Sequence, residues 1–111
     1  MIIETRFLFF ASGITINQNL ILVKPGYLTN EPLIAHERCH QEQMKRIGTV
    51  TFWLKYIFSK RFRLETEIEA YCVSIEKGAN LESCAWNLCR AYLLDIDFNT
   101  AKWMLFNKAT T

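Results

Sequence analysis

The sequence predicts an α+β fold in which a short N-terminal β-hairpin precedes a mainly helical core. Short runs rich in β-branched and aromatic residues are confined to residues 2–23, and apolar residues recur at helical spacing from Pro32 onward. A chain of 111 residues, 50% of them hydrophobic, suits one core and is too short for two ordinary domains. We therefore expect residues 1–111 to form a single domain.

The predicted strands lie in three apolar runs. Residues 7–10 and 14–16 are rich in β-forming side chains, and residues 20–23 follow after an Asn-Gln-Asn segment that is typical of a turn. A Lys-Pro-Gly segment at residues 24–26 then ends the strand. This pattern predicts a small antiparallel hairpin.

Asn30 and Pro32 predict the start of the first helix, because Asn is a favoured N-cap and proline fits the first helical turn. Gly48 is expected to end this helix. The apolar and aromatic residues 49–58 fit either a second helix or an irregular cover over the core. Their aromatic rings suit core packing better than a substrate groove.

Two or three further helices are expected in the second half of the chain. Four apolar residues recur at spacings of four, three and four: Leu64, Ile68, Tyr71 and Ile75. They predict a helix that ends near Gly78. Asn80 can cap another helix running through Tyr92 and Leu93, and residues 97–107 indicate a short final helix.

Composition gives no indication of several kinds of partner. Thirteen basic and eleven acidic residues leave a net charge of +2, too small a bias to indicate nucleic acid or an anionic membrane. No apolar run is long enough to cross a bilayer, because Lys24, Lys55 and Lys60 interrupt the most apolar segments. Residues 7–11 are too short for the core of a signal peptide. We therefore expect a cytoplasmic protein with no membrane span and no nucleic-acid partner.

The four cysteines include no C-x-x-C pair and no framework typical of small secreted domains: Cys39, Cys72, Cys84 and Cys89. Free cysteine is one of the most frequently buried residue types. Buried, reduced thiols are therefore favoured over disulfides or metal ligands.

The two histidines of the chain fall in one motif, His36-Glu37-Arg38-Cys39-His40. Residues four apart lie one above the other on a helix, so both imidazoles can bind one ion. Imidazole nitrogens with a carboxylate suit Zn²⁺, and Glu37 lies where it can reach a water held by the metal. The alternative is a pair of helical histidines that only form hydrogen bonds.

A third ligand is expected from the glutamates at positions 65, 67 and 69. If the stripe from Leu64 to Ile75 marks the buried direction, Glu67 lies about 70° from its centre, Glu65 about 90° and Glu69 about 130°. Glu67 is therefore the predicted ligand, and Glu65 is its closest competitor. In the alternative, all three are solvated surface charges.

The H-E-x-x-H motif with Gln43, followed by Glu67-Ile68-Glu69-Ala70-Tyr71, resembles the gluzincin peptidases, which combine H-E-x-x-H with E-x-x-A-D. The likeness covers residues 13–78. It is greatest to small bacterial and phage-encoded versions in which a G-I-T-I hairpin precedes the zinc helix.

The resemblance implies a zincin-like core with His36, His40 and Glu67 as zinc ligands and Glu37 as general base. Tyr71 departs from the pattern, since it stands where larger families have an aspartate that supports a ligand histidine. Gln43 fits either a hydrogen-bonding group behind the ligands or an ordinary polar residue of the helix.

These observations predict a zinc-dependent hydrolase, a metallopeptidase that uses a zinc-activated water and Glu37 as base on a peptide or protein substrate. Tyr71 or Tyr56 is the expected donor to the oxyanion. The first alternative is a catalytically silent, zinc-stabilised structural or interaction protein. The second is a metal-free helical module, such as a phage component attached to a larger assembly. Only the hydrolase hypothesis requires Glu37. Bound zinc separates the hydrolase and the zinc-stabilised structural protein from the metal-free module.

Overall fold

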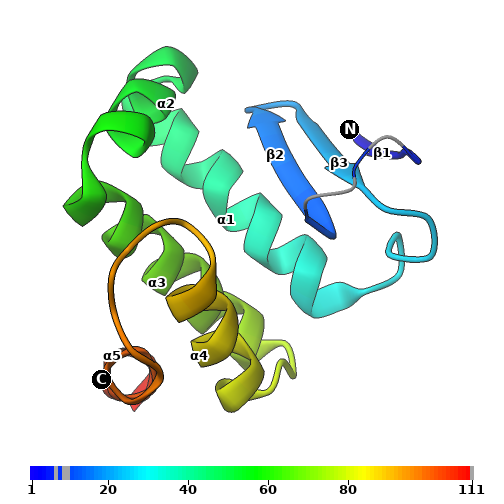
Figure 1. Ribbon diagram of the computed structural model, residues 1–111. Helices are drawn as coiled ribbons and strands as arrows, with labels where there is room; N and C mark the ends of the chain where they lie inside the picture. Colours follow the sequence, from blue (N-terminus) through cyan, green and yellow to red (C-terminus); the bar gives the residue numbers. More distant parts are fainter. Residues whose placement is uncertain (7, 9–10, 111) are drawn as a thin grey trace.

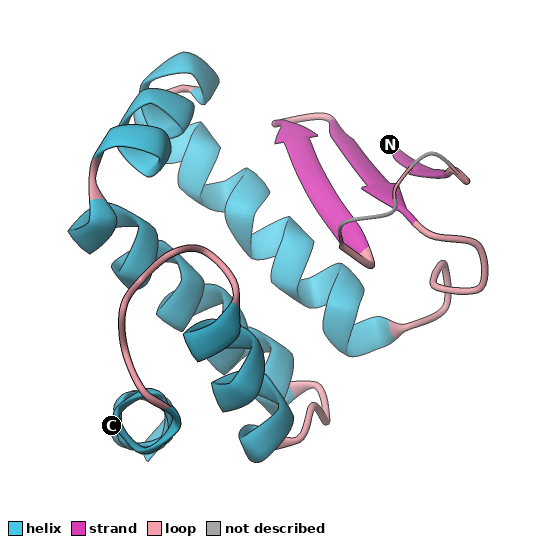
Figure 2. Cartoon of the chain, in the orientation of Figure 1, coloured by secondary structure: helices cyan, strands magenta, loops and turns pink. Residues whose placement is uncertain are grey.

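Strands come first in the chain and helices follow (Figures 1 and 2). The structure is a computed structural model and describes residues 1–6, 8 and 11–110. Three strands, β1 (Ile2–Glu4), β2 (Gly13–Asn17) and β3 (Leu20–Val23), form one sheet in the order β1-β3-β2. The predicted α+β class and N-terminal hairpin are confirmed.

The hairpin is antiparallel, as expected, and the Asn17 side chain accepts a hydrogen bond of 2.8 Å from the backbone N–H of Asn19 in its turn. β1 adds a parallel pairing with β3 in which Ile2 is opposite Ile21. Of the predicted strand at residues 7–10, only Leu8 belongs to the described residues, and it is buried outside any strand.

The first two helices begin and end near Gly48. In α1 (Glu31–Ile47) the Asn30 side chain caps the backbone N–H of Leu33 at 3.1 Å, which confirms the predicted start. Gly48 ends α1 with φ of 90°, a conformation that favours glycine. The following segment is helical, α2 (Thr49–Phe58), and its Phe52 side chain is fully buried.

The long helix α3 (Lys60–Glu76) is covered on two sides. One side packs against α1 and includes the buried residues Glu67, Ala70 and Ser74. In the predicted apolar stripe Tyr71 is buried and the other three residues are partly buried, and the stripe packs in the same cluster as residues of α4 and α5. The stripe thus marks one of two buried directions, because a different layer covers each side of the helix.

The remaining helices, α4 (Leu81–Arg90) and α5 (Phe98–Thr110), complete an apolar core with α3. We call this the helical core; its fully buried members include Ala85, Leu88, Ala101 and Leu105. No helix of the described residues has the length and apolar character needed to span a membrane.

The predicted extension of α4 through Tyr92 and Leu93 is wrong. Both residues have positive φ, 67° and 52°, and the helix ends at Arg90. The Arg63 guanidinium donates to the carbonyl oxygens of Tyr92 at 2.7 Å and Leu93 at 3.4 Å. A hydrogen bond to a charged donor from another helix therefore stabilises a turn that local helix propensity does not favour.

Candidate metal centre

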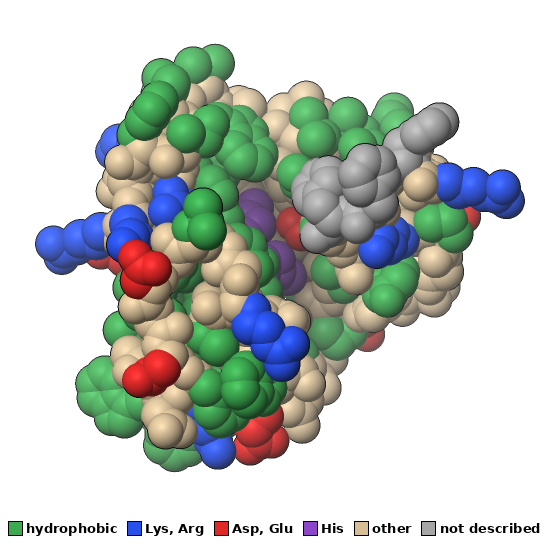
Figure 3. Space-filling view, in the orientation of Figure 1, with side chains coloured by type: hydrophobic (Ala, Val, Ile, Leu, Met, Phe, Trp, Pro, Cys, Tyr) green, Lys and Arg blue, Asp and Glu red, His purple; other side chains and the backbone are tan. Residues whose placement is uncertain are grey.

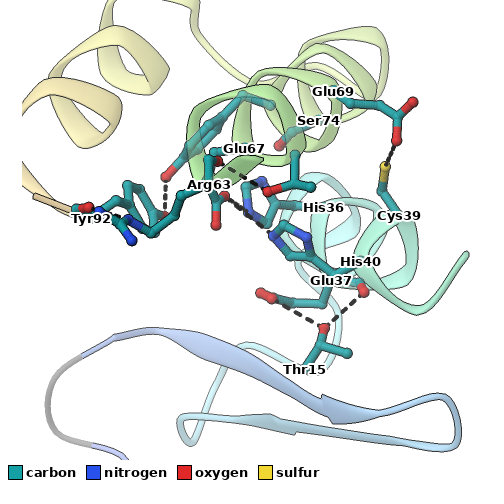
Figure 4. Close-up of polar contacts among 12 residues, drawn as sticks. Thr15, His36, Glu37, Cys39, His40, Arg63, Glu67, Glu69, Ser74 and Tyr92 are labelled. Atoms are coloured by element: carbon teal, nitrogen blue, oxygen red, sulfur yellow. Dashed lines mark hydrogen bonds and ion pairs between the residues drawn. The ribbon is translucent and has the colours of Figure 1, made fainter. Parts of the chain in front are cut away.

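The predicted ligands converge between two helices. His36 and His40 project from α1 toward Glu67 of α3 (Figure 4). The Nε2 atoms of His36 and His40 lie 3.1 and 3.2 Å from the same carboxylate oxygen, Oε1 of Glu67. All three residues are buried, with 6%, 6% and 2% of their surface exposed. The structure thus brings together the three residues that were predicted from the sequence.

The donor set and its spacing fit a zinc ion. One ligand atom from each of His36, His40 and Glu67 lies within 4.8 Å of the others. Bonds of about 2.0–2.1 Å in tetrahedral geometry separate neighbouring ligand atoms by about 3.3 Å. The two nitrogen-to-oxygen distances, 3.1 and 3.2 Å, are therefore close to those of a tetrahedral site. Two imidazoles and one carboxylate also leave a fourth position for water or substrate.

Gln43 orients one of the imidazoles. Its Oε1 atom lies 2.8 Å from Nδ1 of His40, and an amide oxygen can only accept a hydrogen bond. The proton of His40 therefore sits on Nδ1 when the ring is neutral, which leaves Nε2 free to bind a metal. The Gln43 amide nitrogen donates to the backbone oxygen of Thr66 at 3.0 Å and to Glu69 Oε1 at 2.8 Å. Of the two readings of Gln43, the hydrogen-bonding role is the one observed.

Both carboxylate oxygens of Glu67 have interaction partners. Oε1 faces the histidines, and Oε2 accepts a hydrogen bond from the Tyr56 hydroxyl. Burial raises the pKa of Glu67, but the neighbouring histidines outweigh burial and bring the pKa well below its ordinary value. Burial lowers the pKa of His40, but the Glu67 carboxylate reverses this shift and raises the pKa to about 9. Without a metal, the site is therefore an ion pair.

The competing glutamates lie elsewhere. Glu65 is exposed and pairs with Arg61 at 2.9 Å, whereas Glu69 pairs with Arg46 at 3.2 Å. Cys39 lies near Glu69, with its sulfur 3.7 Å from Oε1. Burial and the Glu69 charge raise the pKa of the Cys39 thiol to about 12, which does not favour the thiolate that a metal requires.

Glu37 is close to the donor set but does not belong to it. Its side chain turns toward β2, where the Thr15 hydroxyl lies 3.3 Å from Oε1 of Glu37 and 2.8 Å from its backbone oxygen (Figure 4). Successive helical residues point about 100° apart, so Glu37 cannot share the stripe of His36 and His40. This geometry agrees with the prediction that His36 and His40 face the metal position, whereas Glu37 points elsewhere.

A cleft reaches the ligands from solvent. Two adjoining cavities of about 340 and 410 Å³ meet at His36 and Glu37. In Figure 3 the histidines are visible in a hollow of the surface. The first cavity has an apolar, aromatic wall that includes Phe52, Trp53 and Tyr56. The second has an uncharged polar wall that includes Asn30, Ser83 and Asn87. The aromatic residues of α2 therefore contribute to a groove as well as to packing.

Tyr92 is one of the lining residues that were not predicted as part of the site. It borders both cavities, and its hydroxyl lies 2.6 Å from that of Tyr71. The Tyr71 ring packs against His36 with a centroid distance of 4.3 Å. The predicted oxyanion donors thus have other partners, since Tyr56 donates to Glu67 and Tyr71 bonds to Tyr92. No local pattern marks Tyr92, because the turn that carries it depends on Arg63.

Comparison with protein-family models, curated proteins and solved structures finds no match for the chain.

Proposed function

We propose that the protein is a zinc-dependent hydrolase of the metallopeptidase type, in which His36, His40 and Glu67 hold one Zn²⁺ and Glu37 is the general base. One observation carries the proposal: three buried donors converge at the floor of a cleft, and a second carboxylate, that of Glu37, borders the same cleft without joining them. A purely structural site has no need of this additional carboxylate. The resemblance to gluzincins, on the same residues, supports the same conclusion.

When bound, zinc supplies a Lewis acid that polarises a carbonyl and lowers the pKa of water. Glu37 takes a proton from the attacking water and passes it to the nitrogen that leaves when the amide bond breaks. The Thr15 hydroxyl of β2 lies within hydrogen-bonding distance of the Glu37 carboxylate and orients it. The Tyr71 and Tyr92 hydroxyls share one hydrogen bond, which leaves one hydroxyl hydrogen for a substrate oxygen.

The cleft indicates the substrate class. Its apolar and uncharged polar walls suit an extended peptide or protein segment, with a bulky side chain on the α2 side and backbone amides near the asparagines. The bacterial cytoplasm, or that of a phage-infected host, is the location we propose. Association with a phage particle remains the prediction of the alternative reading.

A structural role for zinc is the second candidate. The observation that favours it is the position of the donors between α1 and α3, with all three side chains buried. In so small a protein, a metal that joins two helices can supply much of the folding free energy. Both candidates predict bound zinc, but only hydrolysis requires Glu37.

The variant Glu37→Gln separates these two functions. It preserves shape but cannot accept a proton, so we expect full zinc content, an unchanged fold and a loss of hydrolysis by about 10²–10⁴-fold. The readout is cleavage of an unfolded protein such as casein. Glu42→Gln is the matched control, because Glu42 lies exposed on the same helix and pairs with Lys45. Equal cleavage by Glu37→Gln and wild type would exclude Glu37 as the base, and no cleavage by either would favour structural zinc.

A pair of alanine variants tests the third ligand. Glu67→Ala removes one of three donors, so zinc affinity should fall by more than about 100-fold. Glu65→Ala changes only an exposed ion pair and should leave the affinity unchanged. Isothermal titration with zinc measures both. A loss for Glu65→Ala with none for Glu67→Ala would show that the ligand assignment is wrong.

A further inference from the structure

The outer face of α2 is apolar and exposed. Four side chains at helical spacing point away from the protein with exposed fractions of 54–82%: Val50, Leu54, Ile57 and Phe58. The inner face is also apolar, since Phe52 is fully buried there. A helix with apolar side chains on two opposite faces is normally covered on both. The outer face of α2 therefore indicates a contact that the isolated chain does not make.

Leu93 extends this exposed surface onto a second element. It is 84% exposed and has a φ of 52°, a conformation that costs free energy for a leucine. Arg63 places it beside the end of α2, because its guanidinium donates to the carbonyl oxygens of Ile57 at 3.1 Å and Leu93 at 3.4 Å. We call Val50, Leu54, Ile57, Phe58 and Leu93 the α2 patch. In Figure 3 hydrophobic atoms gather over α2.

The segment around the patch is basic. Residues 43–64 contain six basic residues and no acidic residue, whereas all eleven acidic residues lie elsewhere in the chain. The six are Lys45, Arg46, Lys55, Lys60, Arg61 and Arg63. The net charge of +2 therefore conceals a local segregation of charge.

Four of the six basic residues have carboxylate partners in the structure, and two of these pairs join Lys45 to Glu42 and Arg46 to Glu69. Lys60 pairs with Asp95, and Arg61 pairs with Glu65, with all four side chains at least half exposed. Exposed ion pairs contribute little free energy, so lipid phosphates can compete with these carboxylates. Lys55 is the charged residue of α2 itself; it is exposed, and its ammonium nitrogen lies 5.7 Å from the centroid of the Phe62 ring. An exposed cation–π contact is weak and the lysine stem is flexible, so the ammonium group of Lys55 can exchange the Phe62 ring for a lipid headgroup.

We propose that the α2 patch docks on the surface of an anionic phospholipid membrane. Apolar side chains on a short exposed helix, with lysine and arginine beside them, are typical of interfacial helices that lie among lipid headgroups. A second copy of the chain fits less well, because a symmetric contact through α2 would bring the basic segments of both copies together. The inner face of α2 lines the cleft, so docking holds the cleft about one helix diameter, 10–12 Å, from the membrane.

Co-sedimentation of the full chain, loaded with zinc, with lipid vesicles tests this proposal. We expect binding to vesicles that contain phosphatidylglycerol, weaker binding to pure phosphatidylcholine, and loss of binding as salt is raised. The double variant Leu54→Ser/Phe58→Ser should bind at least tenfold less tightly. Trp103→Ser is the matched control, because Trp103 is 66% exposed on α5, outside the patch, and its loss should change little.

Lys55→Glu provides a second variant with a different effect. It should weaken binding to anionic vesicles several-fold and leave binding to neutral vesicles unchanged, because it alters charge and not apolar area. Circular dichroism and zinc content establish that each variant is folded.

Three results would overturn the proposal. The first is absence of binding to anionic vesicles by the folded wild type, and the second is an equal loss for the patch variant and the Trp103→Ser control. The third is dimerisation in sedimentation equilibrium that the patch variant abolishes, without vesicle binding, which would show that a second copy covers the patch. None of these measurements depends on hydrolytic activity, so the proposal can fail while the proposed function stands.

Discussion

The two sides of α3 are stabilised by different physical effects. On the side that packs against α1, buried polar residues form a network that we call the metal seam: His36, His40, Gln43 and Glu67. On the other side, the helical core consists of apolar side chains such as Leu88 and Leu105. Apolar burial stabilises a protein under most conditions. Buried charges stabilise it only while they have partners, so the seam should depend on metal and pH, and the core should not.

Zinc removal should produce the largest difference between the two regions. At free zinc about a thousandfold above the Kd, binding stabilises the native state by about 4 kcal/mol. A chelator should therefore lower the Tm of the wild type, and hydrogen exchange should become faster in α1 before it does in α4 and α5. Glu67→Ala is the control, since a 100-fold loss of affinity should reduce its stabilisation at the same free zinc to about 1.4 kcal/mol. A wild-type Tm that does not change with zinc would contradict the assignment of the seam.

Truncation of Leu105 should have the converse effect. Leu105 is fully buried in the helical core, so Leu105→Ala should lower the free energy of unfolding by about 3 kcal/mol through lost burial and a cavity. The zinc affinity of the folded variant should stay within about twofold of wild type, because the seam lies on the other side of α3. Urea unfolding and zinc titration measure the two quantities. A large loss of zinc affinity would show that the regions are coupled.

Gln43→Leu should weaken the seam without removing a ligand. The leucine leaves Nδ1 of His40 without its acceptor, so zinc affinity should fall by about 10–100-fold, equal to about 1.4–2.7 kcal/mol. Gln41→Leu is the control on the same helix, since the Gln41 amide contacts the backbone oxygen of Asn17 at 3.4 Å, away from the ligands. Similar affinities for the two variants would exclude a role for Gln43 in orienting His40.

A smaller effect is expected from pH. The pKa of His40 rises from 6.5 to about 9 in the metal-free protein, so its stabilisation is complete below pH 6.5 and is lost as pH rises through about 9. The pKa of Glu67 is lowered from 4.5, so its stabilisation is present above pH 4.5 and is lost at lower pH. The metal-free seam should therefore be most stable between pH 4.5 and 6.5.

Above pH 6.5 the stability of the zinc-loaded protein should rise with pH, whereas that of the metal-free protein should fall. Zinc competes with protons for the imidazole nitrogens, so its affinity rises with pH. Thermal melts from pH 4 to 9, with zinc and with chelator, measure both slopes. If the Tm depended on pH in the same way with zinc and with chelator, the ion pair between His40 and Glu67 would be contradicted.

The smallest effect is expected outside both regions. Leu93 has a positive φ of 52° and an exposed side chain, and asparagine adopts this conformation more readily. Leu93→Asn should therefore raise the free energy of unfolding by about 0.5–1 kcal/mol. Zinc affinity should not change. A loss of stability in urea unfolding would show that Leu93 makes a stabilising contact in the native state.

Local patterns predicted the parts of the molecule that local physics determines. Asn30, Pro32 and Gly48 marked the bounds of α1, because capping depends on neighbouring residues. Helical phase favoured Glu67 over Glu65 and Glu69, and Glu67 is the glutamate that lies beside the histidines, although it is on the side of α3 that faces α1 and not on that of the apolar stripe. The His36 and His40 pair followed from the same periodicity.

Features that depend on distant residues were not predictable in this way. The parallel pairing of β1 with β3 joins Ile2 to Ile21, and no turn signal connects them. Tyr92 was assigned to a helix because the hydrogen bonds from Arg63 come from another part of the chain. The Tyr56 contact to Glu67 depends on how α2 packs against α3. Each of these features is set by tertiary packing and not by local spacing.

X-ray absorption at the zinc edge, on protein loaded with one equivalent of zinc, tests the central claim most directly. The proposed ligands predict one zinc per chain with only nitrogen and oxygen neighbours at about 2.0–2.1 Å, and with the outer scattering of two imidazole rings. Glu67→Ala should change this spectrum, and Glu65→Ala should not. A sulfur neighbour at about 2.3 Å, or the absence of stoichiometric zinc, would contradict the assignment of His36, His40 and Glu67 as the metal site.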